Sequence, residues 1–437
     1  MKKRIRNGIL LLLCSVIAGS LLLTFIFWLP VEPARRHVSE SLYEMIDIEE
    51  DPAGDVWRKK IVSLKDSFTD CLMVQNALER VDGKGPWSHA MYIYHHDLQD
   101  DTDTTWRTEE SLGAFFDMAP DDMYLKEYSR YWHGYLVFLK PLLLCMSWRH
   151  VETLLVIFHI VLLFAVIISA CYKGKASVGA GIFFTLLFMK PLRIWFSLTL
   201  STCWSITLLA VLVLLWFFER LEERNWQEEF FLLVGITTSY MDFLTYPIVT
   251  LGVPLCVWLL LSQESERKWH DNLFQAFWNC VCWAAGYIGM WGMKWVVAEI
   301  TCRTGTLRNA AWAVLFRTSP LDGYASFSSG IGRTFRAVME QYDTVVYGIV
   351  FGLIAAAAVL AFLWCLVRAR SASWGICMVC LSAAALFPLG WLILTQNHTA
   401  IHCEFTFRIM GVTVMALWSI ASSSLSAVRS RSRAANR

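Results

Sequence analysis

The order of apolar and polar residues divides the chain into long hydrophobic runs and short polar connections. A helix needs about 20 predominantly apolar residues, at about 1.5 Å per residue, to cross the hydrocarbon core of a bilayer. We therefore predict an all-α polytopic membrane protein of about ten transmembrane helices with a large first extracytoplasmic loop. The predicted spans are residues 8–30, 151–171, 177–196, 199–218, 229–246, 248–262, 274–299, 344–367, 375–395 and 408–427.

Basic residues in the short connections set the predicted orientation, because lysine and arginine are held on the cytoplasmic side. The chain begins MKKRIR, and threading the spans from a cytoplasmic N-terminus places YKGK, ERLEER, SERK, RAR and RSRSRAANR on that side. Both termini are thus expected in the cytoplasm. The predicted parts are a cytoplasmic tip and anchor helix (1–31), an extracytoplasmic loop with amphipathic and juxtamembrane helices (32–150), a bundle with an outer loop at 300–343 (151–428), and a basic tail (429–437).

Composition supports a membrane location and excludes several enzyme classes. Apolar residues make up 56% of the chain and charged residues 17%, and there are 21 tryptophans, which is typical of a chain built for lipid. The chain contains no GxxxxGK[ST], HExxH or GxSxG pattern, so nothing predicts a nucleotide loop, a zinc protease or an α/β-hydrolase. We expect membrane lipids among the partners and no nucleic acid.

Asp242 interrupts one of the most hydrophobic stretches, in the sequence SYMDFLTYP. It follows Glu229 at the cytoplasmic edge by about 13 residues, which places it roughly 20 Å across the bilayer, in the outer half. An ionisable residue at that depth normally faces the interior of a bundle or a water-filled cavity, and function is the default hypothesis. The alternative is a capping residue at an abrupt helix end beside Pro247.

Several cationic or titratable residues are predicted at the same outer level. Each one alone is explained by a long side chain that reaches from a span end to the interface. Together they favour a ring around the phosphate of a lipid carrier, which arginine holds with two parallel hydrogen bonds and lysine or protonated histidine holds as a point charge. These residues are Arg130, His133, Lys190, Arg193, His398, His402 and Arg408.

A pair of acids lies in the first outer loop, within LKDSFTDCLMVQNAL. Asp66 and Asp70 are four residues apart and share one face of a helix whose apolar side is expected to lie along the membrane. Two neighbouring carboxylates raise each other's pKa, so either one can serve as a general base, and the pair can also bind a divalent cation. The alternative is an ordinary solvated helix face.

The layout of an anchor span, a large acidic outer loop and about ten spans resembles the GT-C superfamily of polytopic glycosyltransferases. The segments KDSFTDCLM, SRYWHGYLVFLKPLLL, TSYMDFLTYP and HTAIHCEFTFR are similar to uncharacterised integral membrane proteins of Gram-positive bacteria. The resemblance implies a carboxylate base in the first outer loop. Such a base usually follows the first span closely, whereas here only Glu32 does so, and Asp66 comes over thirty residues later.

We therefore predict a glycosyltransferase of a bacterial plasma membrane that moves a sugar from a polyprenyl-phosphate carrier to a glycan or lipid acceptor of the cell envelope. Asp70 is the first choice for the base and Asp66 the second, while Asp242 orients a cation or the acceptor. No nucleotide is required, no cofactor is assigned, and the need for a divalent cation is left open. The alternatives are a transporter or flippase for an envelope precursor, and a non-catalytic assembly scaffold. Polar groups crowded at one face favour the enzyme over a transporter.

Overall fold

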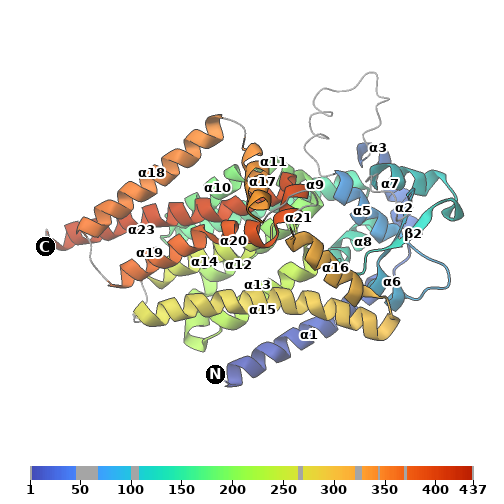
Figure 1. Ribbon diagram of the computed structural model, residues 1–437, viewed down its shortest axis with the longest axis horizontal. Coiled ribbons are helices and arrows are strands. Elements are labelled where there is room, and N and C mark those ends of the chain that lie inside the picture. The colour runs from blue at the N-terminus through green and yellow to red at the C-terminus, as the bar shows by residue number, and fades with distance from the viewer. Residues whose placement is uncertain are drawn as a thin grey trace.

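The computed structural model describes residues 2–45, 67–99, 108–263, 269–319, 327–342, 345–368 and 372–435. The predicted base Asp66 lies outside these residues. The described chain is almost entirely helical, which confirms the predicted all-α class. Long helices run side by side along the long axis of the molecule, and a group of short elements gathers at the end opposite the C-terminus (Figure 1).

The long helices are interrupted by shorter ones in the second half of the chain. The bundle elements are α1 (Lys2–Ile26), α9 (Trp148–Tyr172), α10 (Ala176–Phe188), α11 (Pro191–Phe196), α12 (Leu198–Arg224), α13 (Gln227–Met241), α14 (Ile248–Ser262), α15 (Trp269–Cys302), α16 (Thr306–Thr318), α17 (Phe327–Glu340), α18 (Val345–Arg368), α19 (Ala372–Ala385), α20 (Phe387–Leu394), α21 (Gln396–Ile401), α22 (Cys403–Thr406), η2 (Phe407–Met410) and α23 (Gly411–Ala435).

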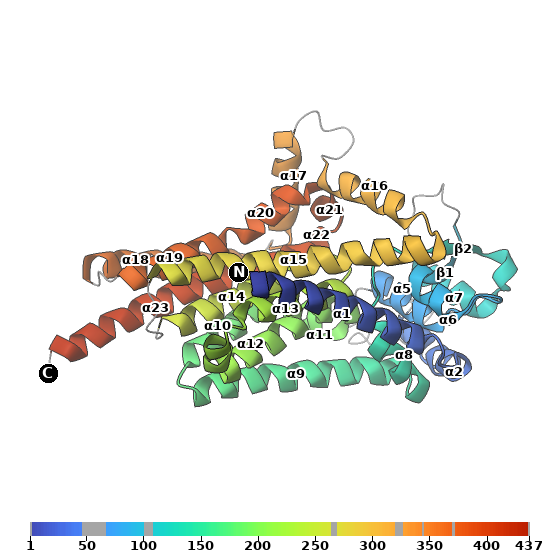
Figure 2. The ribbon, with the colours of Figure 1, turned by 90° about the horizontal axis from the view of Figure 1, so that it is seen from below.

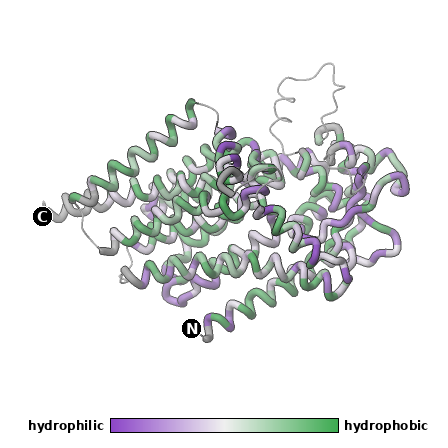
Figure 3. The backbone as a smooth tube through the Cα atoms, viewed as in Figure 1, coloured by the Kyte–Doolittle hydropathy of each residue, from purple (hydrophilic) through white to green (hydrophobic). Residues whose placement is uncertain are grey.

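The short elements before the bundle form what we call the cap region, the described residues from 32 to 145. It contains one antiparallel pair of strands in which Tyr94 lies opposite Glu127. Its elements are α2 (Glu32–Ser39), α3 (Leu42–Met45), α5 (Ser67–Leu78), α6 (Pro86–Tyr92), β1 (Tyr94–Asp97), α7 (Thr108–Asp117), η1 (Pro120–Asp122), β2 (Tyr124–Glu127) and α8 (Leu136–Cys145). Hydrophilic residues are frequent here, whereas hydrophobic residues dominate the long helices (Figure 3).

Among the described residues, six helical segments are long and apolar enough to cross a membrane. This supports a multi-pass membrane protein, while the count of ten spans stays a prediction. The six are Arg4–Ile26, Trp148–Tyr172, Leu198–Arg224, Val345–Trp364, Trp374–Leu394 and Cys403–Ser426.

The predicted span at 177–196 is two helices rather than one. Helix α10 has 13 residues and α11 has six, and Lys190 between them has a positive φ of 59°. A proline disfavours the helical conformation of the residue before it, so Pro191 accounts for a break at this point. The span at 229–246 is likewise shortened, because α13 has 15 residues and ends at Met241.

Helix α5 is a core element of the cap region and does not lie along the membrane as expected. Residues 70–79 are all buried, on every side of the helix. The apolar residues that suggested a membrane-facing side, including Met73 and Leu78, instead pack inside the cap region. The sequence predicted burial only for the apolar side of α5. In the structure, neighbouring elements of the cap region bury the polar side too.

Connections that were predicted to share the cytoplasmic side meet at one end of the bundle. Arg4 near the start of α1 forms an ion pair of 2.6 Å with Glu228 at the start of α13. At the end of α14, Gln263 accepts a hydrogen bond of 2.9 Å from Ser423 of α23. The cap region lies at the other end (Figure 2). The two ends of the fold are therefore distinct, and which end faces the cytoplasm stays a prediction.

We expect the cap region to be extracytoplasmic. A single cysteine introduced at exposed Asp82 should react with a membrane-impermeant maleimide added to intact cells, whereas one at exposed Glu223, at the end of α12, should react only after lysis. The parent chain, with its native cysteines, gives the background. Labelling of Glu223→Cys but not Asp82→Cys in intact cells would reverse the orientation.

Candidate functional site at the broken helices

Three interruptions of the helices lie toward the end of the bundle that carries the cap region, and we call them the three breaks. They are residues 189–190 between α10 and α11, residues 242–247 between α13 and α14, and residues 395–410, which contain α21, α22 and η2. Irregular backbone at membrane depth is tolerated where it is buried in protein or lines a water-filled cavity. Half of the predicted site residues belong to these breaks, namely Lys190, Asp242, His398, His402 and Arg408.

Asp242 is the residue that follows the last turn of α13, and its carboxylate holds the turn that leads to α14. One oxygen accepts a hydrogen bond of 3.0 Å from the backbone N–H of Thr245, and the other accepts from the Thr245 hydroxyl. Its own N–H donates to the carbonyl of Thr238 at 2.9 Å. The side chain is buried. This geometry matches the capping alternative for Asp242.

The break at 242–247 joins two parts of the chain that the sequence places far apart. The ring of Phe243 lies 4.8 Å from the ring of His133 and 5.1 Å from that of Tyr135, both in the cap region. The carbonyl of Leu244 accepts a hydrogen bond of 2.8 Å from Nε2 of His398 in α21. Asp242 therefore stabilises a turn on which the cap region and α21 both rest.

His133 was predicted as a cation of the phosphate ring, and the structure gives it another role. It is buried, and its Nε2 donates to the carbonyl of Tyr128 at 2.9 Å while Nδ1 lies 3.0 Å from the Tyr135 hydroxyl. Burial holds the pKa of His133 well below its usual range. A neutral imidazole that uses both nitrogens within the protein is a structural element, not a phosphate ligand.

Arg130 connects the cap region to α16, and its charge acts on His133. Its Nη1 donates to Oδ1 of Asn309 at 3.0 Å, and its guanidinium carbon lies 5.4 Å from the centre of the Tyr128 ring. Its carbonyl accepts from the indoles of Trp291 and Trp295 at 2.9 and 3.0 Å. These contacts fix its position beside α15.

Lys190 and Arg408 do come together, around the ring of Phe407, and the charge of Arg193 acts on Lys190. The Lys190 Nζ lies 5.2 Å from the centre of that ring, and the Arg408 guanidinium carbon lies 4.6 Å from it. The positive charges that act on Lys190 are those of Arg193 and Arg408. Residues from two of the three breaks, over 200 positions apart in sequence, thus form one electropositive group with Arg193 of α11.

Access differs within this group. Arg408 is 0% exposed, and its Nη1 donates to the carbonyls of Glu404 at 2.8 Å and Phe405 at 3.3 Å. Lys190 and Arg193 are half-buried. A ligand that approaches from outside therefore meets Lys190 and Arg193 first, with Arg408 beneath them as a support. This corrects the expectation that Arg408 itself clamps a phosphate.

The two histidines of the third break also differ. His398 is buried, and burial together with the positive charge of Arg317 holds its pKa well below the usual range. His402, whose ring lies 4.9 Å from that of His398, has a side chain 35% exposed. Its Nδ1 is 3.7 Å from Oε1 of Glu404, which is 48% exposed. His402 and Glu404 are therefore reachable, and His398 is not.

Asp70, the preferred base, binds the first turn of α12. Its carboxylate accepts from the backbone N–H groups of Leu198 and Thr199 at 3.1 and 2.9 Å. It also accepts from the hydroxyls of Thr199 and Ser197 at 2.7 and 3.3 Å. A buried carboxylate with four donors at a helix N-terminus is well stabilised in place. This geometry points to a structural cap between the cap region and the bundle.

Arg317 is a residue that the sequence did not single out. It lies in the last turn of α16, where its Nη1 donates to the hydroxyl of buried Tyr131, whose ring is stacked 5.8 Å from that of Trp291. Its charge acts on His398. The only sequence signal was a cation within the predicted outer loop 300–343, which nothing in its spacing distinguished from the others.

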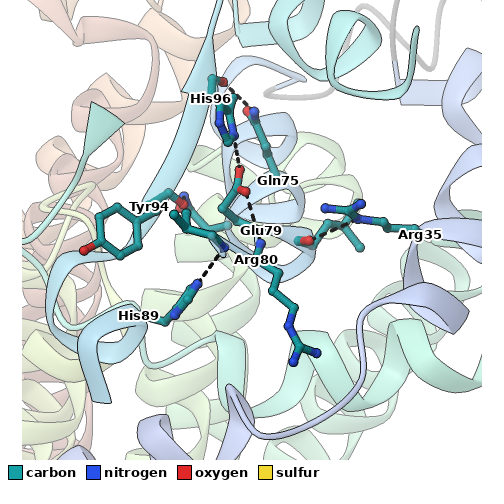
Figure 4. A network of polar contacts seen from close by, with 10 residues as sticks. Arg35, Gln75, Glu79, Arg80, His89, Tyr94 and His96 are labelled. Atoms are coloured by element: carbon teal, nitrogen blue, oxygen red, sulfur yellow. Dashed lines mark hydrogen bonds and ion pairs between the residues drawn. The ribbon is translucent and has the colours of Figure 1, made fainter. Parts of the chain in front are cut away.

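A second polar network lies inside the cap region (Figure 4). Oε2 of Glu79 lies 2.9 Å from Nδ1 of His96, and both residues are buried. Gln75 donates to the His96 carbonyl. The pair joins the residue that follows α5 to β1, and no local pattern indicated it because the two residues are 17 positions apart.

Among the described residues, no group of three or more histidine, cysteine, aspartate or glutamate side chains is placed to hold a metal ion. The cation alternative for Asp66 and Asp70 stays untested, because Asp66 lies outside those residues. Comparison of the chain with family models, with curated proteins and with solved structures found no match. Function is therefore argued from the geometry of the three breaks.

Proposed function

We propose that the protein is a membrane glycosyltransferase that moves a sugar from a polyprenyl-phosphate carrier to a cell-envelope acceptor at the outer face of a plasma membrane. The observation that carries the proposal is the electropositive group of Lys190, Arg193 and Arg408 at two helix breaks. Transfer from such a donor releases a lipid phosphate, and fixed cations stabilise the negative charge that develops on it. Lys190 and Arg193 are the members that reach a bound phosphate.

The base is better assigned to Glu404 than to Asp70. The Glu404 carboxylate is 48% exposed and lies beside His402, whereas the Asp70 carboxylate is buried among the donors at the start of α12. Glu404 also adjoins the electropositive group, because its backbone carbonyl accepts from Arg408 at 2.8 Å. A general base must reach the proton that it removes, and Glu404 satisfies that condition.

The proposed step balances without a cofactor. The Glu404 carboxylate takes the proton of an acceptor hydroxyl, whose oxygen attacks the anomeric carbon of the sugar. The bond from that carbon to the phosphate oxygen breaks, and the phosphate keeps the electron pair. Lys190 and Arg193 offset its charge, and the ring of Phe407 lies against both Lys190 and Arg408.

The test is transfer of labelled sugar from polyprenyl-phosphate donors to envelope material in membranes that contain or lack the full-length protein. We expect transfer only where the protein is present, and mass spectrometry of envelope polymers from cells with and without it should show the missing sugar. If no donor sugar is transferred and the polymers are identical, the proposal is wrong.

One observation favours the alternative of a transporter or flippase. Transporters bind substrates at discontinuous helices. Here α10 and α11 are separated by a break at Lys190, and α13 and α14 by a break at residues 242–247. A flippase would move a fluorescent lipid-linked precursor between leaflets of proteoliposomes with no acceptor present. The glycosyltransferase requires an acceptor and changes the chemical product, so the two functions give different results.

A further inference from the structure

Lys140 is a buried lysine in an apolar helix of the cap region, away from the three breaks. It lies in the middle of α8, whose sequence is LVFLKPLLLC, and is 1% exposed. Its Nζ lies 5.0 Å from the centre of the Phe27 ring, just beyond the end of α1. An ammonium removed from water costs several kcal/mol unless an anion or several acceptors compensate. The position therefore needs an explanation beyond packing.

The charges around Lys140 are of the same sign. Within the described part of the chain, the charges that act on it are those of Arg80 and Arg35. Burial, with a contribution from these two arginines, lowers the pKa of Lys140 to about 8. The ammonium form is still the main one at neutral pH, so three cations lie together where α1, α2, α5 and α8 meet.

His89 faces the same ring and does not add to this charge. Its ring lies 5.5 Å from that of Phe27. Its Nε2 accepts from the backbone N–H of Val81 at 3.0 Å, and its Nδ1 lies 3.1 Å from the carbonyl of Gly85. Both nitrogens are used in a neutral imidazole, and burial lowers the pKa of His89. The cluster therefore consists of two arginines and one lysine.

The end of α5 positions Arg35 directly, and Arg80 follows that end by two residues. The Arg35 Nε donates to the carbonyl of Leu78 at 3.4 Å, and its Nη1 lies 4.0 Å from Oε1 of Glu32. Glu32 is 81% exposed, so that pair contributes little. Arg80 is exposed, and its side chain extends away from Glu79, between His89 and Arg35 in the view of Figure 4.

Exposed apolar side chains place the cluster near the membrane surface. Phe25 and Trp28, on either side of Phe27, and Phe138, two residues before Lys140, are all exposed large hydrophobic residues. Aromatic residues of this kind gather at the level of lipid headgroups. The cations of the cluster then lie where phosphate groups of the outer leaflet are concentrated.

We propose that Arg35, Arg80 and Lys140 form a phosphate-binding site. Lys140 is its buried ligand, and the two arginines bind the phosphate from the sides that are closer to solvent. The phosphate comes either from an anionic lipid headgroup or from free phosphate, and it compensates the buried ammonium. Arginine matches phosphate oxygens with its planar fork, and lysine supplies a point charge. This site is separate from Lys190 and Arg193 and does not depend on the proposed transfer reaction.

To test the site, the full-length protein in detergent is titrated with short-chain dioctanoyl phosphatidylglycerol and, separately, with sodium phosphate. The unfolding midpoint is measured at each concentration of the probe, and bound ligand is detected by native mass spectrometry. Lys140→Met keeps the length of the side chain but removes its charge, and Arg80→Gln changes an exposed residue with little risk to folding. Both variants should bind the effective probe about tenfold more weakly, as expected for the loss of one charge-assisted contact. Lys84→Gln, an exposed cation of the cap region, is the matched control.

The two arms identify the source of the phosphate. Tighter binding of phosphatidylglycerol than of sodium phosphate assigns the site to a lipid headgroup, and comparable binding assigns it to free phosphate. Equal binding of both probes by the parent, Arg80→Gln and Lys84→Gln overturns the proposal, even if Lys140→Met does not fold. Absence of binding to either probe overturns it as well.

Discussion

Replacing Asp70 with asparagine should reduce the free energy of unfolding by about 2–4 kcal/mol. The buried carboxylate accepts from the N–H groups of Leu198 and Thr199 and from the Thr199 hydroxyl. Asparagine has one acceptor oxygen, and its amide NH₂ would face a backbone N–H that then has no acceptor. The negative charge that favours the N-terminus of α12 is lost as well.

The measurement is the unfolding midpoint of the purified protein in detergent, by thermal inactivation of its monodisperse peak in size-exclusion chromatography. Asp121→Asn, an exposed aspartate in η1 of the same region, is the matched control and should leave the midpoint unchanged. Asp70→Asn also distinguishes a catalytic base from a cap at the N-terminus of α12. A variant that is as stable as the parent but does not transfer sugar would assign the base to Asp70. A destabilised variant that still transfers sugar would support the role of a helix cap.

The sequence predicts the apolar helices well because their signal is local. A run of apolar residues of the right length is enough to predict α1, α9, α12 and α18, whatever they pack against. The break at Lys190 also has a local cause, since Pro191 follows it, and a stricter use of that proline would have divided the predicted span. Local sequence patterns were therefore sufficient to predict the long apolar helices and would also have been sufficient to predict the break before Pro191.

The roles of the polar residues were less accessible, because they depend on contacts across the chain. Asp70 caps a helix that begins 128 residues later, and no spacing within LKDSFTDCLM indicates that partner. His133 and Arg408 are cations by residue type, yet one is held neutral by burial and the other is fully covered. Burial is decided by tertiary packing, so the residue types alone could not show which of these cations are exposed.

Lys190→Gln and Arg193→Gln should each lower the rate of sugar transfer by about a hundredfold, or about 2.7 kcal/mol of transition-state stabilisation. Both side chains are half-buried. Lys190 lies beside Phe407, and the charges of Arg193 and Arg408 both act on it, so Lys190 and Arg193 can together hold a phosphate at the break between α10 and α11. Each glutamine keeps a polar side chain of similar reach but cannot offset the charge of the leaving phosphate. Stability should change little, because the structure places no carboxylate contact on either residue within its described part.

The measurement is initial transfer of labelled sugar from a polyprenyl-phosphate donor in membranes with matched amounts of each variant. Arg224→Gln, a cation in the last turn of α12 at the opposite end of the bundle, is the control and should keep the parent's rate. Arg193→Lys refines the assignment, because it retains the charge and loses the planar fork. A rate that recovers in Arg193→Lys indicates a point charge, and one that stays low indicates two parallel hydrogen bonds to the phosphate. Parent rates in both Lys190→Gln and Arg193→Gln would show that the electropositive group only anchors the helices at the interface, and the phosphate would then have to be held elsewhere.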